Sequence, residues 1–272
     1  MKKTSVGVTV ALLTLAAAAS VSASVISNEP CTAADFGDVG TNLLGKGGGT
    51  GWNGTWGPGQ TSSYLVGPGL TYGGPATWPS CERSVNSNYT GSNYGRRIVP
   101  DASTSGTTGI NGTTVWFSCL IQPHATMAAG AGARIMFMTN SSGSGFGIEI
   151  DSTNGFRARG QGGLGNGSGT LTTDHVYLVI GKVAFGATND TVSLWVDPAN
   201  PTSEANLGTA SSTLTTTTKI AFPGPTALNN YFLWCRNITN GAADIYYAGN
   251  FQIGNFPGDV GVPVSLSGFS IE

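Results

Sequence analysis

The chain has 272 residues and a formal net charge of −2, and charged residues make up only 10% of it. That fraction is far below the roughly 25% of ordinary soluble domains, and a chain so sparsely charged and mildly acidic is not expected to bind nucleic acid. The 42 glycines, together with abundant Thr, Ser and Asn, indicate an extracellular β-protein with an uncharged polar surface.

The first 23 residues have the layout of a secretory signal peptide. Lys2 and Lys3 form a basic start, residues 6–19 form an apolar stretch, and Val21 and Ala23 occupy the −3 and −1 positions. The apolar stretch is too short to span a bilayer comfortably. We therefore predict a signal peptide at 1–23 and a mature chain that is secreted or displayed at a cell surface, without membrane insertion. The short basic start and the alanine-rich stretch favour a bacterial source.

The mature chain reads as short strands separated by turn residues. Residues 113–122 are apolar on both faces, which indicates a central strand between two layers. Residues 175–185 and 191–197 predict a hairpin, because Asn and Asp occupy the short loop between them. Further strands are expected at 133–139, 145–151, 230–239 and 245–254, with the Gly- and Thr-rich stretches 161–170 and 211–219 as the connections between strands.

These elements predict an all-β, two-sheet antiparallel sandwich, because many short strands at even spacing are typical of sandwiches and jelly rolls. No amphipathic helix pattern of useful length follows the signal peptide. The sandwich is predicted as one domain over 24–272, within the size range of such folds. Residues 257–272 are expected to form an extra strand or a tail.

Three stretches carry a resemblance to a known group. They are DFGDVGTNLLGKGGGTGWNGTW at 35–56, VWFSCLIQ at 115–122, and YLVIGKVAFGATNDTVSLWVDPANP at 177–201. In this order they resemble exported bacterial proteins of the concanavalin A-like, laminin-G-like superfamily, over about 35–254. The resemblance implies a jelly roll that binds carbohydrate or another extracellular ligand, including a role in adhesion. The chain departs from the group at 249–255, where an acidic residue before an "RIG" strand would be expected.

The four cysteines are far apart in the sequence and form no CxxC motif. An even number in an exported chain is read first as two disulfides, with three pairings open. We favour Cys31–Cys81 and Cys119–Cys235. Free buried thiols are the alternative.

The sharpest catalytic motif is the stretch GFGIEID, with Glu149 and Asp151. The same superfamily includes laminarinase-type glycoside hydrolases, whose catalytic strand reads E-x-D-x-x-E or E-x-D-x-E. Alternation along a strand puts Glu149 and Asp151 on one face, but the second Glu of the motif is missing. A retaining glycosidase needs two carboxyl groups about 5–5.5 Å apart. We therefore expect both residues to be solvent-facing strand residues and the protein to be no enzyme.

Other catalytic signatures are weaker still. There is no GxSxG motif, and His124 and His175 have no acidic residue at a useful sequence spacing, so both are expected to be surface histidines. Residues 160–165 match GxGxxG, but without a βαβ unit this stretch is expected to be a loop.

Calcium is the one cofactor for which candidates exist. Oxygen ligands from Asp and Asn suffice for Ca²⁺, and Asn189, Asp190 and Asp197 lie at the ends of the predicted hairpin. The same residue types are common in turns, where their side chains cap their own backbone. The sequence leaves the two interpretations open.

A sugar-binding platform needs exposed aromatic rings beside polar groups. Aromatic residues crowd the glycine-rich first third of the mature chain, where loops could present them. The candidates for ligand contact are Trp52, Trp56, Trp78, Tyr89, Asn93 and Tyr94. For Trp52 and Trp56 the alternative is that they fasten the first strand to the sandwich, whereas Trp116, Trp195 and Trp234 lie within strands and are assigned to the core.

Three functions follow from these observations. The first is a secreted, non-catalytic module that binds carbohydrate or an extracellular matrix component. The second is a surface protein that assembles into a homo-oligomer or polymer by pairing strand edges, with residues 24–32 and 256–272 as the exchanged strands. The third is a divergent polysaccharide hydrolase that uses Glu149.

Overall fold

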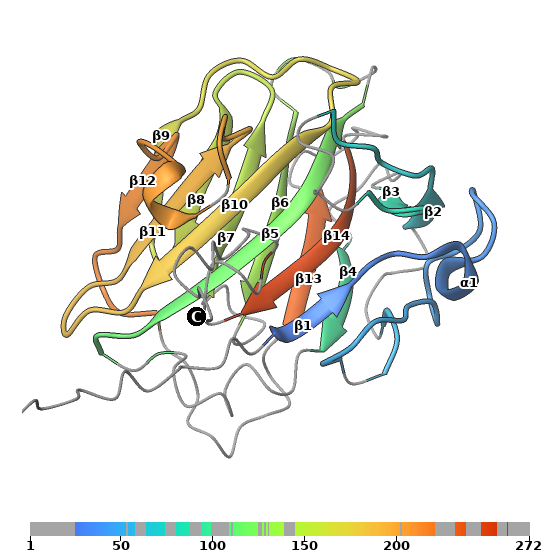
Figure 1. Ribbon diagram of the computed structural model, residues 1–272, viewed down its shortest axis with the longest axis horizontal. Coiled ribbons are helices and arrows are strands. Elements are labelled where there is room, and N and C mark those ends of the chain that lie inside the picture. The colour runs from blue at the N-terminus through green and yellow to red at the C-terminus, as the bar shows by residue number, and fades with distance from the viewer. Residues whose placement is uncertain are drawn as a thin grey trace, which may run out of the picture.

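The structure is a computed structural model of the chain (Figure 1). It describes residues 25–52, 54–57, 64–73, 80–86, 94–98, 109, 111–124, 127, 129, 131–138, 145–201, 203–220, 232–237, 246–254 and 260. Of these, the side chains at 25, 26, 94–98, 138, 232, 234, 236 and 237 are not described. The predicted signal peptide, and residues 257–272 apart from Val260, therefore lie outside the described residues.

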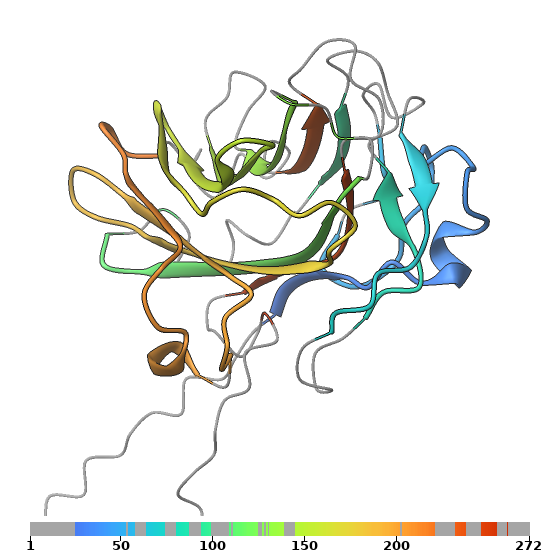
Figure 2. The same ribbon diagram turned by 90° about the horizontal axis from the view of Figure 1, so that it is seen from above.

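Two antiparallel sheets are packed face to face (Figure 2). Sheet A has eight strands, in which β1 (Val25–Glu29) pairs with β14 beside β3. The order of the other seven is β12 (Ser212–Thr215), β11 (Thr191–Val196), β10 (Tyr177–Ala184), β5 (Thr114–Pro123), β14 (Tyr246–Gly254), β3 (Ser84–Asn86) and β2 (Leu65–Gly67).

Sheet B has six strands. Their order is β4 (Tyr94–Ile98), β13 (Phe232–Asn237), β6 (Gly132–Met138), β7 (Gly145–Asp151), β8 (Gly155–Gly160) and β9 (Gly163–Gly167). The helical elements of the described residues are short: α1 (Ala33–Phe36) and the 3₁₀ turn η2 (Glu204–Asn206).

The core lies between the sheets because alternate residues of each strand point inward. The ring of Phe117 on β5 contacts Phe137 on β6 and Phe146 on β7, with centroids 5.4 and 5.5 Å away. Gly181 on β10 makes room for this cluster, since a Cβ there would lie 2.0 Å from the Phe117 ring. The two sheets are therefore joined through aromatic rings that fit over a glycine.

The outer face of sheet A is also covered. Trp116 and Trp195 stack there with centroids 5.8 Å apart, and the Lys182 ammonium lies 5.1 Å from the Trp116 ring centroid. Lys182 also pairs with Glu204 of η2. The Ser118 hydroxyl on the same face donates to the backbone carbonyl of the buried Val260 at 2.9 Å. Both tryptophans are buried as predicted, but on the outside of sheet A, and the side chain of Trp234 is not described.

One side of the sandwich is closed by Ser212 on β12. Its hydroxyl accepts the Ala158 N–H of β8 at 2.8 Å and donates to the Asn166 carbonyl of β9 at 2.5 Å. The Asn166 side chain in turn bonds the backbone of Ser211 and Thr213. On the edge strands β9 and β12, these contacts bond the Asn166 carbonyl and the Thr213 N–H, two groups that would otherwise be open to pairing with another chain.

The structure confirms an all-β, two-sheet antiparallel jelly-roll sandwich, with β5 as a central strand and a β10–β11 hairpin. The expectation for the connecting stretches was wrong. Residues 155–167 form the β8–β9 hairpin, and residues 212–215 form β12. The GxGxxG stretch is therefore a strand end, a turn and a strand start. Over the residues described, no helix is long and apolar enough to cross a membrane.

Candidate functional site: an arginine and glutamate face on sheet B

The outer face of sheet B carries a row of charged positions. Successive strands pair Arg134 on β6 with Glu149 on β7, and Glu149 with Arg157 on β8. Directly opposite residues of an antiparallel pair have Cβ atoms about 4.5–5.5 Å apart on the same face. The inward residues of β7, Ile148 and Ile150, are fully buried, so the charged side chains occupy the opposite face.

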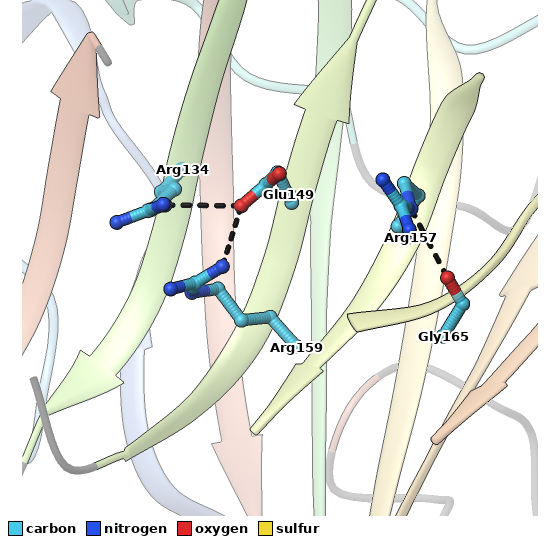
Figure 3. Close-up of polar contacts among 5 residues, drawn as sticks. All are labelled: Arg134, Glu149, Arg157, Arg159 and Gly165. Atoms are coloured by element: carbon cyan, nitrogen blue, oxygen red, sulfur yellow. Dashed lines mark hydrogen bonds and ion pairs between the residues drawn. The ribbon is translucent and has the colours of Figure 1, made fainter. Parts of the chain in front are cut away.

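Glu149 is held by two arginines (Figure 3). Its Oε2 accepts from Arg134 Nε at 3.0 Å and from Arg159 Nη1 at 2.7 Å. The Glu149 side chain is 8% exposed, whereas those of Arg134 and Arg159 are each 23% exposed. The expectation of a solvent-facing Glu149 was therefore wrong, because two guanidinium groups from the neighbouring strands lie over the carboxylate.

Both contacts use the same carboxylate oxygen. No described group donates to the other oxygen, Oε1, and each arginine uses only one of its nitrogens in this pair. Burial and the neighbouring Arg134 lower the pKa of Arg159, and Glu149 opposes that shift. The cluster thus combines an acceptor and several N–H donors that the described residues leave available.

The residue opposite Arg159 on β7 is a glycine, Gly147, and the backbone of β6 leaves no room for a side chain there. A Cβ at position 147 would lie 2.2 Å from the Ile135 carbonyl oxygen. Arg157 is directed the other way, and its Nε donates to the Gly165 carbonyl on β9 at 3.0 Å (Figure 3).

Asp151 stabilises the β7–β8 turn through hydrogen bonds. Its Oδ1 accepts the backbone N–H groups of Thr153 and Asn154 at 2.8 and 3.0 Å, and its Oδ2 accepts the Asn154 side-chain amide at 3.0 Å. Partial burial raises the pKa of Asp151, but these hydrogen bonds outweigh it and leave the pKa below the usual value. Asp151 is thus bound to its own turn, while Glu149 is bound to arginines.

The aromatic candidates do not form a platform in the described part of the chain. Trp56 is fully buried against Phe251, so its assignment to ligand contact was wrong and its role is to fasten the N-terminal segment to the core. Trp52 is half-buried and packs against the core. Tyr94 lies in β4, where its side chain is not described. Trp78, Tyr89 and Asn93 lie outside the described residues.

The calcium candidates do not fit a shared ion. Asn189 and Asp190 precede β11 and Asp197 follows it, so the strand separates them by about 20 Å at 3.3 Å per residue. The carboxylate of the buried Asp190 accepts the N–H groups of Gly186 and Ile220 at 3.1 and 2.6 Å. Within the described ranges, no group of three acidic, Cys or His side chains is placed to hold a metal.

Asp197 instead pairs with His175, for which the sequence showed no acidic residue at a useful spacing. His175 Nε2 lies 2.8 Å from Asp197 Oδ2, and Leu178 N–H donates to Oδ1 at 2.8 Å. Burial and Asp197 raise the pKa of the nearby Tyr72 to about 12. The antiparallel β10–β11 hairpin brings this pair together, and the His175 side chain is 49% exposed, so the expectation of a surface histidine is confirmed. Within the described residues, no Ser, Thr or Cys side chain forms a hydrogen bond with His175.

The predicted disulfides are not formed. All four cysteines are buried free thiols. Burial raises the pKa of Cys81 to about 11 and that of Cys235 to about 12. The sulfurs of Cys31 and Cys81 nevertheless lie 3.6 and 2.6 Å from the position of a Cβ on Gly249, so these two thiols are neighbours.

Sequence reasoning missed the three arginines of the site. The signal was present in the alternation of GFRARG at 155–160, which places Arg157 and Arg159 on one strand face. Residues 155–159 were assigned to no element, because the predicted connection was placed at 161–170, and Arg134 was read only as part of a strand. The partners of Glu149 depend on strand register, which the sequence does not state.

No protein-family model and no curated protein matches the sequence. Solved structures with a similar fold include the catalytic domain of a glycoside hydrolase family 131 protein from Coprinopsis cinerea, with 13% identity and a TM-score of 0.45 over 72% of this chain and 78% of that one. Peanut lectin has 10% identity and a TM-score of 0.42 over 71% and 90%. An endo-1,3-beta-glucanase from Streptomyces sioyaensis has 12% identity and a TM-score of 0.40 over 71% and 89%.

These structures are lectins and glucanases, the group that the sequence resembles. Their identities and TM-scores are too low to carry an argument about what this chain does. The function is therefore argued from the side chains of the site.

Proposed function

We propose that the protein is an exported, non-catalytic β-sandwich that binds carbohydrate on the outer face of β6, β7 and β8. One observation carries the proposal: Glu149 binds Arg134 and Arg159 through Oε2 alone, and its other carboxylate oxygen, which points away from them, has no donor among the described residues (Figure 3). The site thus presents an acceptor and donors within a few ångströms of one another. Export is inferred from the signal peptide layout of residues 1–23.

The chemistry of a sugar fits this combination. Each hydroxyl of a pyranose both donates and accepts a hydrogen bond, so two neighbouring hydroxyls can donate to Glu149 Oε1 and accept from an arginine. Hydrogen bonds with an ionised partner are roughly twice as strong as neutral ones. Because the two ion pairs already hold the three side chains in place, a ligand would lose little affinity to side-chain ordering.

The environment of the carboxylates supports a binding role over hydrolysis. A retaining glycosidase uses one carboxylate as nucleophile and a second carboxyl group as acid. Asp151, the nearest acid along β7, accepts three hydrogen bonds from its own turn. Glu149 is fixed by two cations. Neither arrangement favours an acid that must give up a proton at neutral pH.

The test is retention of the purified mature protein, residues 24–272, on a panel of insoluble and immobilised polysaccharides. Glu149→Gln keeps the side-chain shape and removes the charge, so we expect it to weaken retention about tenfold or more. Glu204→Gln makes the same chemical change on the outer face of sheet A and is the matched control. Circular dichroism and the unfolding midpoint report whether each variant is folded.

The outcomes separate the candidate functions. Equal retention of the wild type and a folded Glu149→Gln would remove this face as the binding site. Failure to bind any glycan would overturn the proposal. Release of reducing ends from a retained glycan, abolished in Glu149→Gln, would instead support the hydrolase. Loss of retention with a chelator would reveal a calcium requirement served by residues other than Asn189, Asp190 and Asp197.

Self-assembly finds less support in the described contacts. Residues 25–29 pair with β14 of the same chain, and the Asn166 carbonyl of β9 and the Thr213 N–H of β12 are bonded within the chain. An exchanged N-terminal strand would first have to leave its own sheet. Size-exclusion chromatography of the mature protein measures this alternative directly, and a polymer that disappears when residues 24–32 are deleted would favour it.

A further inference from the structure

We infer that the saccharide bound by this face is anionic, carrying carboxylate or sulfate groups. This inference rests on the proposed function and narrows its ligand class. Its basis is an excess of guanidinium groups over free carboxylates on this face. Arg134, Arg157 and Arg159 lie beside Glu149. The other carboxylate of β7, that of Asp151, is hydrogen-bonded to its own turn.

The charge of the face is opposite to that of the chain. The whole sequence carries a net charge of −2 and seven arginines, and three of them lie on β6 and β8 of this one face. Two more arginine positions lie in line with these residues. Position 236 on β13 is paired with Arg134, and position 96 on β4 is paired with position 234 on β13, one row further along. The described lysines, Lys46, Lys182 and Lys219, lie elsewhere in the fold.

The arginines keep the donors that an oxyanion needs. Arg134 and Arg159 each use one nitrogen for Glu149, and Arg157 uses Nε for the Gly165 carbonyl. None of their remaining N–H groups has a hydrogen-bond partner among the described residues. A guanidinium group presents its N–H donors in a planar fork that matches carboxylate and sulfate bidentately, which an ammonium does not.

The spacing favours a polymer over a single small anion. Arg134 and Arg157 lie on strands separated by β7, so two strand spacings of about 4.8 Å put their backbones roughly 10 Å apart. The Arg157 side chain is directed toward Gly165 on β9 and away from Arg134 and Arg159 (Figure 3), so a single carboxylate or sulfate bound by that pair would not reach Arg157. Charges on neighbouring sugars of one chain can bond the pair and Arg157, while hydroxyls between them reach Glu149 Oε1.

The experiment compares matched anionic and neutral glycans with the mature protein, residues 24–272. Polygalacturonate and its carboxyl-reduced form test carboxylates, and dextran sulfate and dextran test sulfates. We expect at least a tenfold preference for the anionic member of one pair, and affinity that falls as NaCl rises from 50 to 500 mM. Single-stranded DNA of similar charge is the comparison for a non-saccharide polyanion.

Variants test whether the preference for anionic glycans comes from the arginines on the outer face of β6, β7 and β8. Arg157→Gln should lower affinity for the anionic glycan about five- to tenfold. Arg157→Lys should restore only part of the loss, because the charge returns without the fork. Lys219→Gln removes one positive charge elsewhere on the protein and should have no effect.

The results distinguish this inference from the proposed function. Equal, salt-insensitive binding of the neutral and anionic glycans would overturn the inference and leave the carbohydrate-binding proposal standing. Binding of no glycan would overturn both. If single-stranded DNA binds as tightly as the preferred glycan, the ligand is not specifically a saccharide. If Lys219→Gln and Arg157→Gln lose equal affinity for the anionic glycan, the binding site is not on this face.

Discussion

The hydroxyl of Ser212 on β12 accepts the backbone N–H of Ala158 on β8 at 2.8 Å, which joins the edge of one sheet to a strand of the other. Both residues are fully buried. Leaving a buried amide N–H without its acceptor lowers the free energy of unfolding by about 1–3 kcal/mol, so this bond stabilises the packing of the two sheets.

Ser212→Ala should therefore lower the free energy of unfolding by about 1–3 kcal/mol. Urea denaturation followed by tryptophan fluorescence measures the change. Thr213→Ala is the control, because the neighbouring Thr213 is exposed and only its backbone N–H is bonded, to Asn166. Equal stability of the Ser212 and Thr213 variants would contradict a structural role for the bond.

Gly181→Ala should destabilise the protein by about 1–3 kcal/mol through overpacking, since the new Cβ would lie 2.0 Å from the Phe117 ring. Adding Phe117→Leu should recover part of that loss by removing the ring. A double-mutant cycle in urea measures the coupling. Additive effects of the two changes would show that Gly181 is not needed to seat Phe117.

Glu149→Gln should lower stability by about 1–3 kcal/mol, because the change removes a nearly buried carboxylate that two arginines bond at 3.0 and 2.7 Å. The midpoint of urea unfolding at pH 7 is the measurement. Since the pairs are electrostatic, the difference should shrink in 0.5 M NaCl. A difference that does not respond to salt would mean that shape, not charge, is responsible.

The stability contributed by Asp151 should depend on pH. Its pKa is lowered in the folded protein by hydrogen bonds from Asn154 and Thr153, so its contribution is present above the unfolded pKa of about 3.9 and is lost as pH falls through the folded pKa. The melting temperature of Asp151→Ala should lie below that of the wild type at pH 7, and the gap should narrow below pH 3.8. A constant gap between pH 7 and pH 2.5 would contradict this.

The thiols should resist alkylation in the native state. Only the thiolate reacts, and burial raises the pKa of Cys81 to about 11 and that of Cys235 to about 12. Reaction with iodoacetamide at pH 8 should be at least about 100-fold slower than in guanidinium chloride. Mass spectrometry after denaturation should count four alkylated cysteines, and a count of two would report a disulfide, for which the neighbouring Cys31 and Cys81 are the candidates.

The strands with continuous apolar runs could be predicted from the sequence, and those rich in glycine and threonine could not. β5, β10 and β11 are filled with residues such as Val, Ile, Leu, Phe and Trp, whose pattern is local. β9 and β12 have few such residues, and their place is set by contacts from far along the chain, such as that between Ser212 and Ala158. A local pattern does not contain those contacts.

The candidate site was predictable only in part for a similar reason. Alternation placed Glu149 on one face of its strand, but its partners Arg134 and Arg159 are chosen by the register of three strands, and a shift of one residue would turn them to the other face. The pairing of His175 with Asp197 was easier to predict from the sequence. A predicted hairpin with a known loop already brings the start of one strand near the end of the other.

The position of β14 has a consequence for how the chain folds. This strand, at 246–254, separates β5 from both β1 and β3 in sheet A. A chain emerging from its N-terminus can form the local bridge between Asn28 and Thr50, but β1 meets its partner strand only when residue 254 is free, more than 200 residues later. Pairing over such sequence separations makes folding slow. Strands β5, β10, β11 and β12 can pair in chain order, whereas β1 and β3 can join them only through β14, the last described strand.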